Sequence, residues 1–155
     1  MTLIIFTIFA NHLKTELLGR IMAIDYGRKR VGIAVTDPMQ IIATGLKTVQ
    51  ANEIFIFFKA YFAKEKVDAV VVGYPRQMNN EASESVKYIN PFIKKLKKEW
   101  PDMLVELQDE RFTSKMASQA MIDGGLKKKD RQNKALVDEI SATIILQSYM
   151  ERKKI

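Results

Sequence analysis

Apolar runs and short polar turns alternate at the start of the organised part of this chain. Ile21 to Ile24 and Val31 to Val35 are apolar, and the polar stretch Tyr26 to Arg30 separates them. Runs of this length, joined by a turn that contains a glycine, predict the two strands of a hairpin. A third strand is predicted over Ile41 to Val49, entered through the turn at Asp37-Pro38. That turn is a sufficient explanation for Asp37.

The pattern then changes to helices that alternate with strands. Asn52 is expected to cap a helix, because apolar side chains recur after it at helical spacing at Ile54, Phe55, Phe58, Tyr61 and Phe62. The later elements are predicted as strand Val67 to Gly73, helix Glu81 to Trp100 with a kink or break at Pro91, strand Met103 to Gln108, a helix from Thr113 or Ser114 to Gly124-Gly125, a mobile basic loop Leu126 to Lys134 and helix Ala135 to Arg152. This order predicts an α/β fold: a mixed five-stranded sheet, three antiparallel strands then β/α alternation, flanked by helices.

The first 18 residues differ from this pattern. Leu3 to Ala10 is apolar but too short to span a bilayer, and no lysine or arginine precedes it as in a signal peptide. We expect residues 1–18 to be an extension, either a packed strand, a short helix or a segment upstream of the true start. Residues 19–155 are expected to form one domain, since 155 residues suit a single well-buried core.

Composition limits the chemistry. The chain has no cysteine and one histidine, His12, so thiolate and His-rich metal sites are excluded. A metal site must therefore use oxygen ligands, which favours Mg²⁺ or Mn²⁺. The formal charge of +7 and the pI near 9.5 favour a polyanionic partner, nucleic acid first. Each lysine run also suits an ordinary solvated surface.

Acidic residues follow predicted strands or begin the last helix. Asp25 ends the first strand, Asp109 and Glu110 end the last strand, and Asp138 lies early in the final helix. If these elements meet, clustered carboxylates repel and call for a cation. Two divalent ions about 4 Å apart activate water against a phosphodiester, which suggests metal-dependent nucleic-acid hydrolysis. The alternatives are a turn-initiating Asp25, a surface pair at 109–110, and an Asp138 placed by the helix dipole.

Four sequence blocks resemble the YqgF family, the Holliday-junction resolvase-like proteins also described as pre-16S ribosomal RNA nucleases. They are IDYGRKRVGIAVTD at 24–37, VVVGYP at 70–75, DERFTS at 109–114 and DEISATIILQSYM at 138–150. The resemblance implies a ribonuclease H-like fold and a metal-dependent nuclease that matures the 5′ end of 16S rRNA. Asp25, Glu110 and Asp138 would then be the catalytic acids and metal ligands, with Asp109 the fallback for Glu110.

The resemblance also sets expectations about partners. The candidates for phosphate contacts are Arg28, Lys29, Arg76, Arg111, Lys127, Lys128 and Lys129. We expect a cytoplasmic monomer or weak homodimer that binds RNA (pre-16S rRNA), with branched DNA as the second substrate and no membrane. The sequence departs from the family at Asn79-Asn80, where an Asp-Gly is usual, and in the extension before Gly19.

Three other functions compete with this one. A non-catalytic RNA-binding ribosome-assembly factor would use the same basic loops, and a Holliday-junction resolvase would use the same acids. An ATP-binding protein of the related actin-like fold would cradle phosphates with an Asp-x-Gly hairpin. That fold generally needs a second subdomain, for which 155 residues leave no room.

Overall fold

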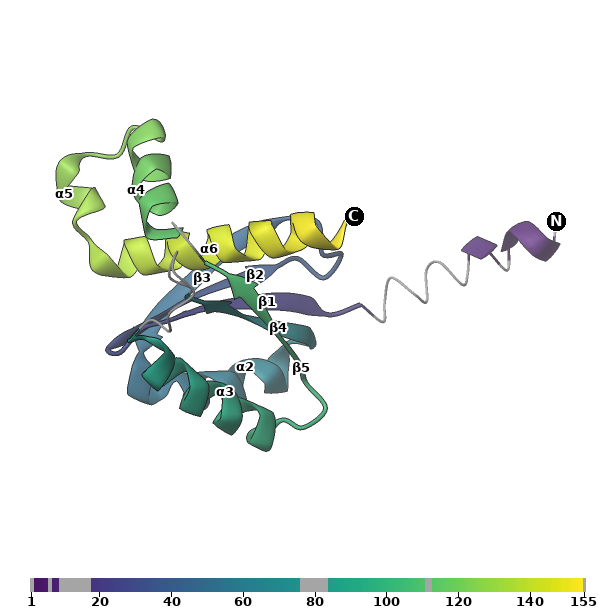
Figure 1. Ribbon diagram of the computed structural model, residues 1–155. Coiled ribbons are helices and arrows are strands. Elements are labelled where there is room, and N and C mark those ends of the chain that lie inside the picture. The colour runs from purple at the N-terminus through teal and green to yellow at the C-terminus, as the bar shows by residue number, and fades with distance from the viewer. Residues whose placement is uncertain (1, 6, 9–17, 76–83, 111–112, 155) are drawn as a thin grey trace.

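The computed structural model describes residues 2–5, 7–8, 18–75, 84–110 and 113–154, and gives side-chain surroundings in the last range from residue 116 on. Five strands form one sheet in the order β3-β2-β1-β4-β5 (Figure 1). They are β1 (Arg20–Tyr26), β2 (Arg30–Thr36), β3 (Ala43–Gln50), β4 (Val67–Tyr74) and β5 (Leu104–Asp109). The first three strands pair antiparallel, whereas β4 pairs parallel with both β1 and β5. The predicted α/β fold, a mixed five-stranded sheet flanked by helices, is confirmed.

Helices cover both faces of this sheet. They are the 3-10 turn η1 (Ala51–Glu53), α2 (Ile54–Lys64), α3 (Val86–Glu99), α4 (Thr113–Asp123), α5 (Lys128–Arg131) and α6 (Lys134–Lys153). Figure 1 shows α2 and α3 on one face and α6 on the other, with α4 and α5 beyond one end of α6. The fold is therefore three layered, with the sheet in the middle.

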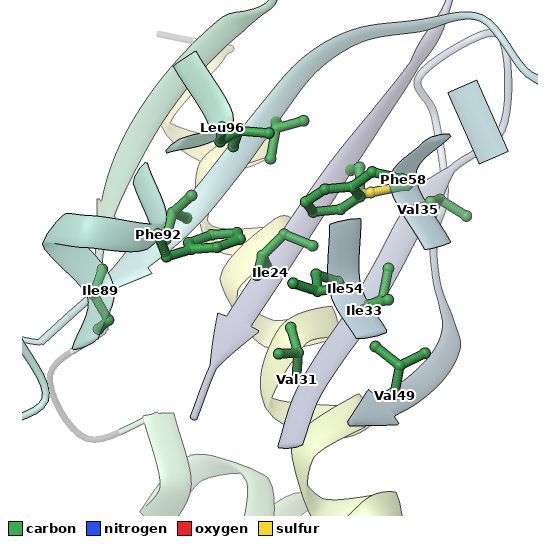
Figure 2. Close-up of a cluster of buried hydrophobic side chains, with 13 residues drawn as sticks. Ile24, Val31, Ile33, Val35, Val49, Ile54, Phe58, Ile89, Phe92 and Leu96 are labelled. Atoms are coloured by element: carbon green, nitrogen blue, oxygen red, sulfur yellow. The ribbon is translucent and has the colours of Figure 1, made fainter. Parts of the chain in front are cut away.

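Strand alternation divides the core into two clusters. On the α2/α3 face, Ile24 packs among Phe58 and Phe92, as Figure 2 shows. On the other face, Ala23 and Ala34 lie beneath Ile145 of α6. All of these side chains are at most 3% exposed, and burying each large one contributes about 1.5–3 kcal/mol. The alanines let α6 approach the sheet closely.

Several boundary predictions are wrong for local reasons. The break predicted at Pro91 is wrong, because α3 is continuous and the buried residues Ile89 and Phe92 anchor the chain on both sides of it; the kink stays a prediction. Asn52 caps no helix but lies within η1, and Glu53 precedes α2 without a side-chain cap. The basic loop contains the four-residue helix α5. A side-chain cap is instead found at Asn133, which accepts hydrogen bonds from the first turn of α6.

The Asp37 turn behaves as expected and shortens the third strand. Its carboxylate accepts hydrogen bonds from the backbone N–H groups of Met39, Ile41 and Ile42 at 2.7 to 3.1 Å. These contacts hold residues 41 and 42 in the turn, so β3 begins at Ala43 rather than at Ile41.

The apolar start of the chain is helical where it is described. Residues 2–5 and 7–8 are helical, so the strand alternative is wrong for them. Leu3, Ile4, Ile5 and Ile8 remain 59 to 81% exposed. Among the described helices, none is both long enough and apolar enough to cross a membrane.

Candidate active site

Three of the predicted acids lie around one edge of the sheet. Strands β1, β4 and β5 are parallel, so their carboxyl ends share that edge. Asp25 is the second-last residue of β1, and Glu110 directly follows β5. The backbone N–H of Glu110 donates to the carbonyl oxygen of Tyr74 at 3.3 Å, which fixes the exit of β5 beside the end of β4.

Strand alternation also decides which of the two acids at the end of β5, Asp109 or Glu110, faces α6. The side chains of Glu106 and Gln108 contact Lys153 and Arg152 of α6. Because successive strand residues point to opposite faces, Glu110 follows Glu106 and Gln108 onto this face and Asp109 does not. Ile21 and Ala23 pack under α6 in the same way, so Asp25 also faces α6. The choice between Asp109 and Glu110, open in the sequence, therefore favours Glu110 on geometric grounds.

Two glycines give these acids their positions. Gly32 pairs with Asp25 across β1 and β2, and a Cβ built on it would lie 2.0 Å from the carbonyl oxygen of Asp138. A Cβ on Gly73 would lie 2.6 Å from Oε2 of Glu110. The missing side chains therefore let the backbone of α6 and the Glu110 carboxylate rest directly on the sheet.

The acids interact electrostatically across this edge. Burial, followed by the charge of Asp138, raises the pKa of Asp25 from its ordinary value of 3.8 to about 7. Burial raises the pKa of Glu110 from 4.5 to about 8, with further contributions from the charges of Asp25 and Asp109. The charge of Asp138 thus acts on Asp25, and the charge of Asp25 acts on Glu110, so Asp25 links the two other predicted acids.

Arg30 is a site residue that the sequence reasoning did not single out. Its Nε donates to Oδ2 of Asp138 at 2.8 Å, and the two side chains are 32% and 22% exposed. The signal lay in strand periodicity. Arg30 and Gly32 are two positions apart on β2 and share a face, so an α6 residue packed on Gly32 is within reach of Arg30. The ion pair orients the Asp138 carboxylate.

The donor set at this edge suits a hard divalent cation. It consists of carboxylate oxygens, and burial with mutual repulsion makes a cation favourable there. As arranged, the described part of the chain contains no group of three acidic, histidine or cysteine residues close enough to hold one ion. One oxygen of Asp138, Oδ2, accepts a hydrogen bond from the guanidinium of Arg30 instead. The chemistry fits Mg²⁺ or Mn²⁺, with Asp25, Glu110 and Asp138 as the residues that would hold it.

The predicted phosphate contacts lie on two sides of the acids. Arg28 and Lys29 are exposed in the turn between β1 and β2. The lysines 127–129 are exposed at α5, which packs against α6 near the end that carries Asp138. Figure 1 shows α5 and the β1–β2 turn at the same end of the molecule. Arg76 and Arg111 lie outside the described residues.

The raised pKa values predict how stability depends on pH without metal. Ionising Asp25 and Glu110 costs more in the folded than in the unfolded chain, so the unfolded state binds fewer protons. Their contribution should lower the free energy of unfolding as pH rises from about 5 to 8. Chemical unfolding in EDTA at both pH values measures this fall, and Asp25→Asn should reduce it. A variant with the same pH dependence as the wild type would contradict the assignment.

The fold and this edge define an α/β protein with a mixed five-stranded sheet and a carboxylate-rich candidate centre. The model of the RuvX family, described as Holliday junction resolvase, matches residues 19–152, and the chain belongs to this family. The resemblance carried by the four sequence blocks is therefore confirmed.

Several proteins are similar to this chain over nearly the whole of their own length. A protein of Phocaeicola vulgatus is 62% identical over 137 residues, 88% of this chain and 99% of that protein. Proteins of Bacteroides fragilis (strain ATCC 25285) and Flavobacterium psychrophilum are also 62% identical, over 138 and 136 residues, covering 89% and 88% of this chain and 100% and 99% of their own. All three are named "Putative pre-16S rRNA nuclease". The solved structure of T. thermophilus RuvC with a Holliday junction substrate aligns over 87% of this chain and 96% of its own, at 16% identity and a TM-score of 0.49.

Proposed function

We propose that this protein is a metal-dependent endonuclease that hydrolyses phosphodiesters of structured nucleic acid, with pre-16S rRNA as its substrate. The observation that carries the proposal is the electrostatic coupling of Asp25 to both Asp138 and Glu110 at the carboxyl edge of the sheet. The high identity to proteins named for that activity, over nearly their whole length, supports the choice of RNA.

The residues have separable roles in this proposal. Asp25, Glu110 and Asp138 hold Mg²⁺ or Mn²⁺, which when bound activates a water and stabilises the leaving oxygen of the phosphodiester. Arg30 orients the carboxylate of Asp138 through its 2.8 Å contact. Arg28, Lys29 and the lysines 127–129 bind backbone phosphates on either side of the acids, which fixes the register of the strand.

A binding-only protein is the second candidate function. The ion pair between Arg30 and Asp138, and the lack of a preassembled three-acid group in the described residues, suit a ribosome-assembly factor that binds RNA without cleaving it. The basic surface would serve such a factor equally well. Binding and cleavage must therefore be measured separately.

The test uses the full chain with a structured precursor of 16S rRNA and with a four-way DNA junction. Each substrate is incubated with Mg²⁺, Mn²⁺ or EDTA, and binding is measured in parallel in EDTA. Cleavage of the RNA that needs the metal and yields discrete products supports the proposal. Selective cleavage of the junction would identify branched DNA, rather than RNA, as the substrate. Binding with no cleavage in either metal would favour the assembly factor.

Neutralising the lysines at α5 should weaken RNA binding and reduce its dependence on salt. We expect the triple variant Lys127→Gln, Lys128→Gln, Lys129→Gln to flatten the slope of log K against log[salt] by about 0.7–0.9 for each phosphate that the variant no longer neutralises. Filter binding over a salt series measures this slope. The control neutralises the exposed Lys94, Lys97 and Lys98 of α3 and removes the same charge. Equal effects of the two variants would mean that α5 does not bind phosphate locally.

A further inference from the structure

An arginine and a tyrosine meet at the sheet edge on the side away from α6. The guanidinium carbon of Arg28, in the turn after β1, lies 5.7 Å from the ring centroid of Tyr88 near the start of α3. The distance is within the range of a cation–π contact. We call these two residues the Arg28–Tyr88 pair.

Tyr88 is an aromatic residue that the core does not use. Its helix neighbours Ile89 and Phe92 are 1% and 3% exposed, whereas Tyr88 is 38% exposed. Elsewhere on the same helix, Phe92 stacks on the ring of Tyr26 with centroids 4.3 Å apart. The ring of Tyr88 therefore keeps part of its surface in solvent.

The pair and the acids occupy the two sides of one edge. Asp25 faces α6, and the next residue, Tyr26, belongs to the cluster on the α3 face. Arg28 follows only three residues after Asp25 and lies against α3. A nucleic-acid strand that passes from the acids around the end of β1 would therefore reach Tyr88. Exposed Lys29 and Lys87 lie next to the pair in sequence and favour a polyanion there.

We propose that the Arg28–Tyr88 pair is a stacking subsite for an unpaired nucleobase that flanks the phosphodiester at the acids. The proposal rests on the nucleic-acid substrate of the proposed function. Aromatic rings and guanidinium planes are the groups on which proteins stack unpaired bases, at about 1–3 kcal/mol for each base. A paired base stays inside its duplex and offers no free face. The subsite therefore selects a duplex with a single-stranded extension over a blunt one.

The test compares binding of two RNA hairpins that differ only in a short unpaired extension. Binding is measured by fluorescence anisotropy in EDTA, so the result does not depend on cleavage. The wild-type chain should prefer the extended hairpin about fivefold or more, the lower end of the stacking energy converted to affinity. Tyr88→Ala should abolish that preference, and Tyr88→Phe, which keeps the ring, should retain it.

A matched control separates stacking from charge. Arg28→Ala should reduce the preference for the extended hairpin, whereas Lys95→Ala should only weaken both hairpins alike. Lys95 also lies over an aromatic ring, 4.2 Å from the centroid of Phe55, so its replacement removes the same charge and the same kind of interaction. Thermal melting checks that Tyr88→Ala remains folded.

Three results would overturn the subsite. The first is that the wild type does not prefer the extended hairpin, and the second is that this preference survives Tyr88→Ala. The third is that Tyr88→Phe loses as much of the preference as Tyr88→Ala does. Failure of the proposed function gives a different result, because a chain that never cleaves RNA can still lose its preference with Tyr88→Ala. The binding preference measured in EDTA therefore tests the stacking subsite independently of cleavage.

Discussion

Replacing Asp25 with asparagine is expected to lower the metal-dependent cleavage rate more than about 100-fold while leaving the chain folded. Asp25 is the acid whose ionisation is coupled to both Asp138 and Glu110, so its charge is central to holding a cation. Replacing a residue that only supports a metal ligand already lowers metal affinity or activity about 10–100-fold, and replacing a direct ligand should lower it more. Single-turnover cleavage of the precursor RNA in Mn²⁺ measures the rate. Asparagine removes a buried charge, so the melting temperature in EDTA at pH 8 should not fall.

Asp109 provides the control for this variant. It is also acidic and lies at the same edge, but strand alternation turns it away from the face of Asp25. Asp109→Asn should keep the rate within about threefold of the wild type, and Asp138→Asn should match the loss of Asp25→Asn. Equal activity of Asp25→Asn and wild type would remove the carboxylate centre from the mechanism. Equal loss with Asp109→Asn would indicate a general effect of charge.

The layers of the fold were predictable because each element has its own periodicity. The buried stripe of α3, Ile89, Phe92 and Leu96, follows the helical repeat, and it outweighs the single proline in its midst. The failure at Asn52 has the opposite cause: a good capping residue is only a local preference, and the chain turns first into η1. Local sequence patterns therefore predict which elements form, whereas a single breaking or capping residue does not by itself fix where they begin and end.

The site was predictable in its acids and not in their surroundings. Asp25 stands out in the sequence because a carboxylate at the end of an apolar strand needs an explanation. Arg30 and Asp138 are separated by 108 positions, so no local pattern announces their contact. Only the pairing of β1 with β2 and the packing of α6 on β2 bring them together. The contact between Arg30 and Asp138 depends on strand register and helix packing, so it could be recognised only in the structure.

Gly32, a glycine inside a strand, carries information about the site. A glycine inside a strand weakens it, so its presence often marks a close backbone approach. Gly27 lies in the turn and was used to predict the hairpin. Gly32 was not used, although it is the position where the structure brings α6 against the sheet. Gly32 sits opposite Asp25, so the approach of the helix and the position of the acid are linked.

The second large effect is therefore expected from Gly32→Ala. The new Cβ would lie 2.0 Å from the carbonyl oxygen and 2.4 Å from the carbonyl carbon of Asp138, and backbone atoms of a packed helix cannot rotate away. Relieving this overlap must move α6, which should lower the free energy of unfolding by about 1–3 kcal/mol. A shift of about 1 Å in Asp138 should also reduce cleavage about 100-fold. Chemical unfolding and single-turnover kinetics measure the two effects.

Gly45→Ala is the matched control, since Gly45 also lies on a strand beneath α6. Its Cβ would meet the side chain of Glu139, with Oε1 at 2.6 Å and Cγ at 2.8 Å, and that flexible chain has other rotamers. Alanine also restricts the unfolded chain, which offsets part of the cost, so the loss should stay below about 1 kcal/mol with cleavage nearly unchanged. If both variants lost stability equally, overlap with the backbone of Asp138 would not be the cause. If Gly32→Ala kept full activity at a temperature where it is folded, the position of Asp138 would not control the reaction.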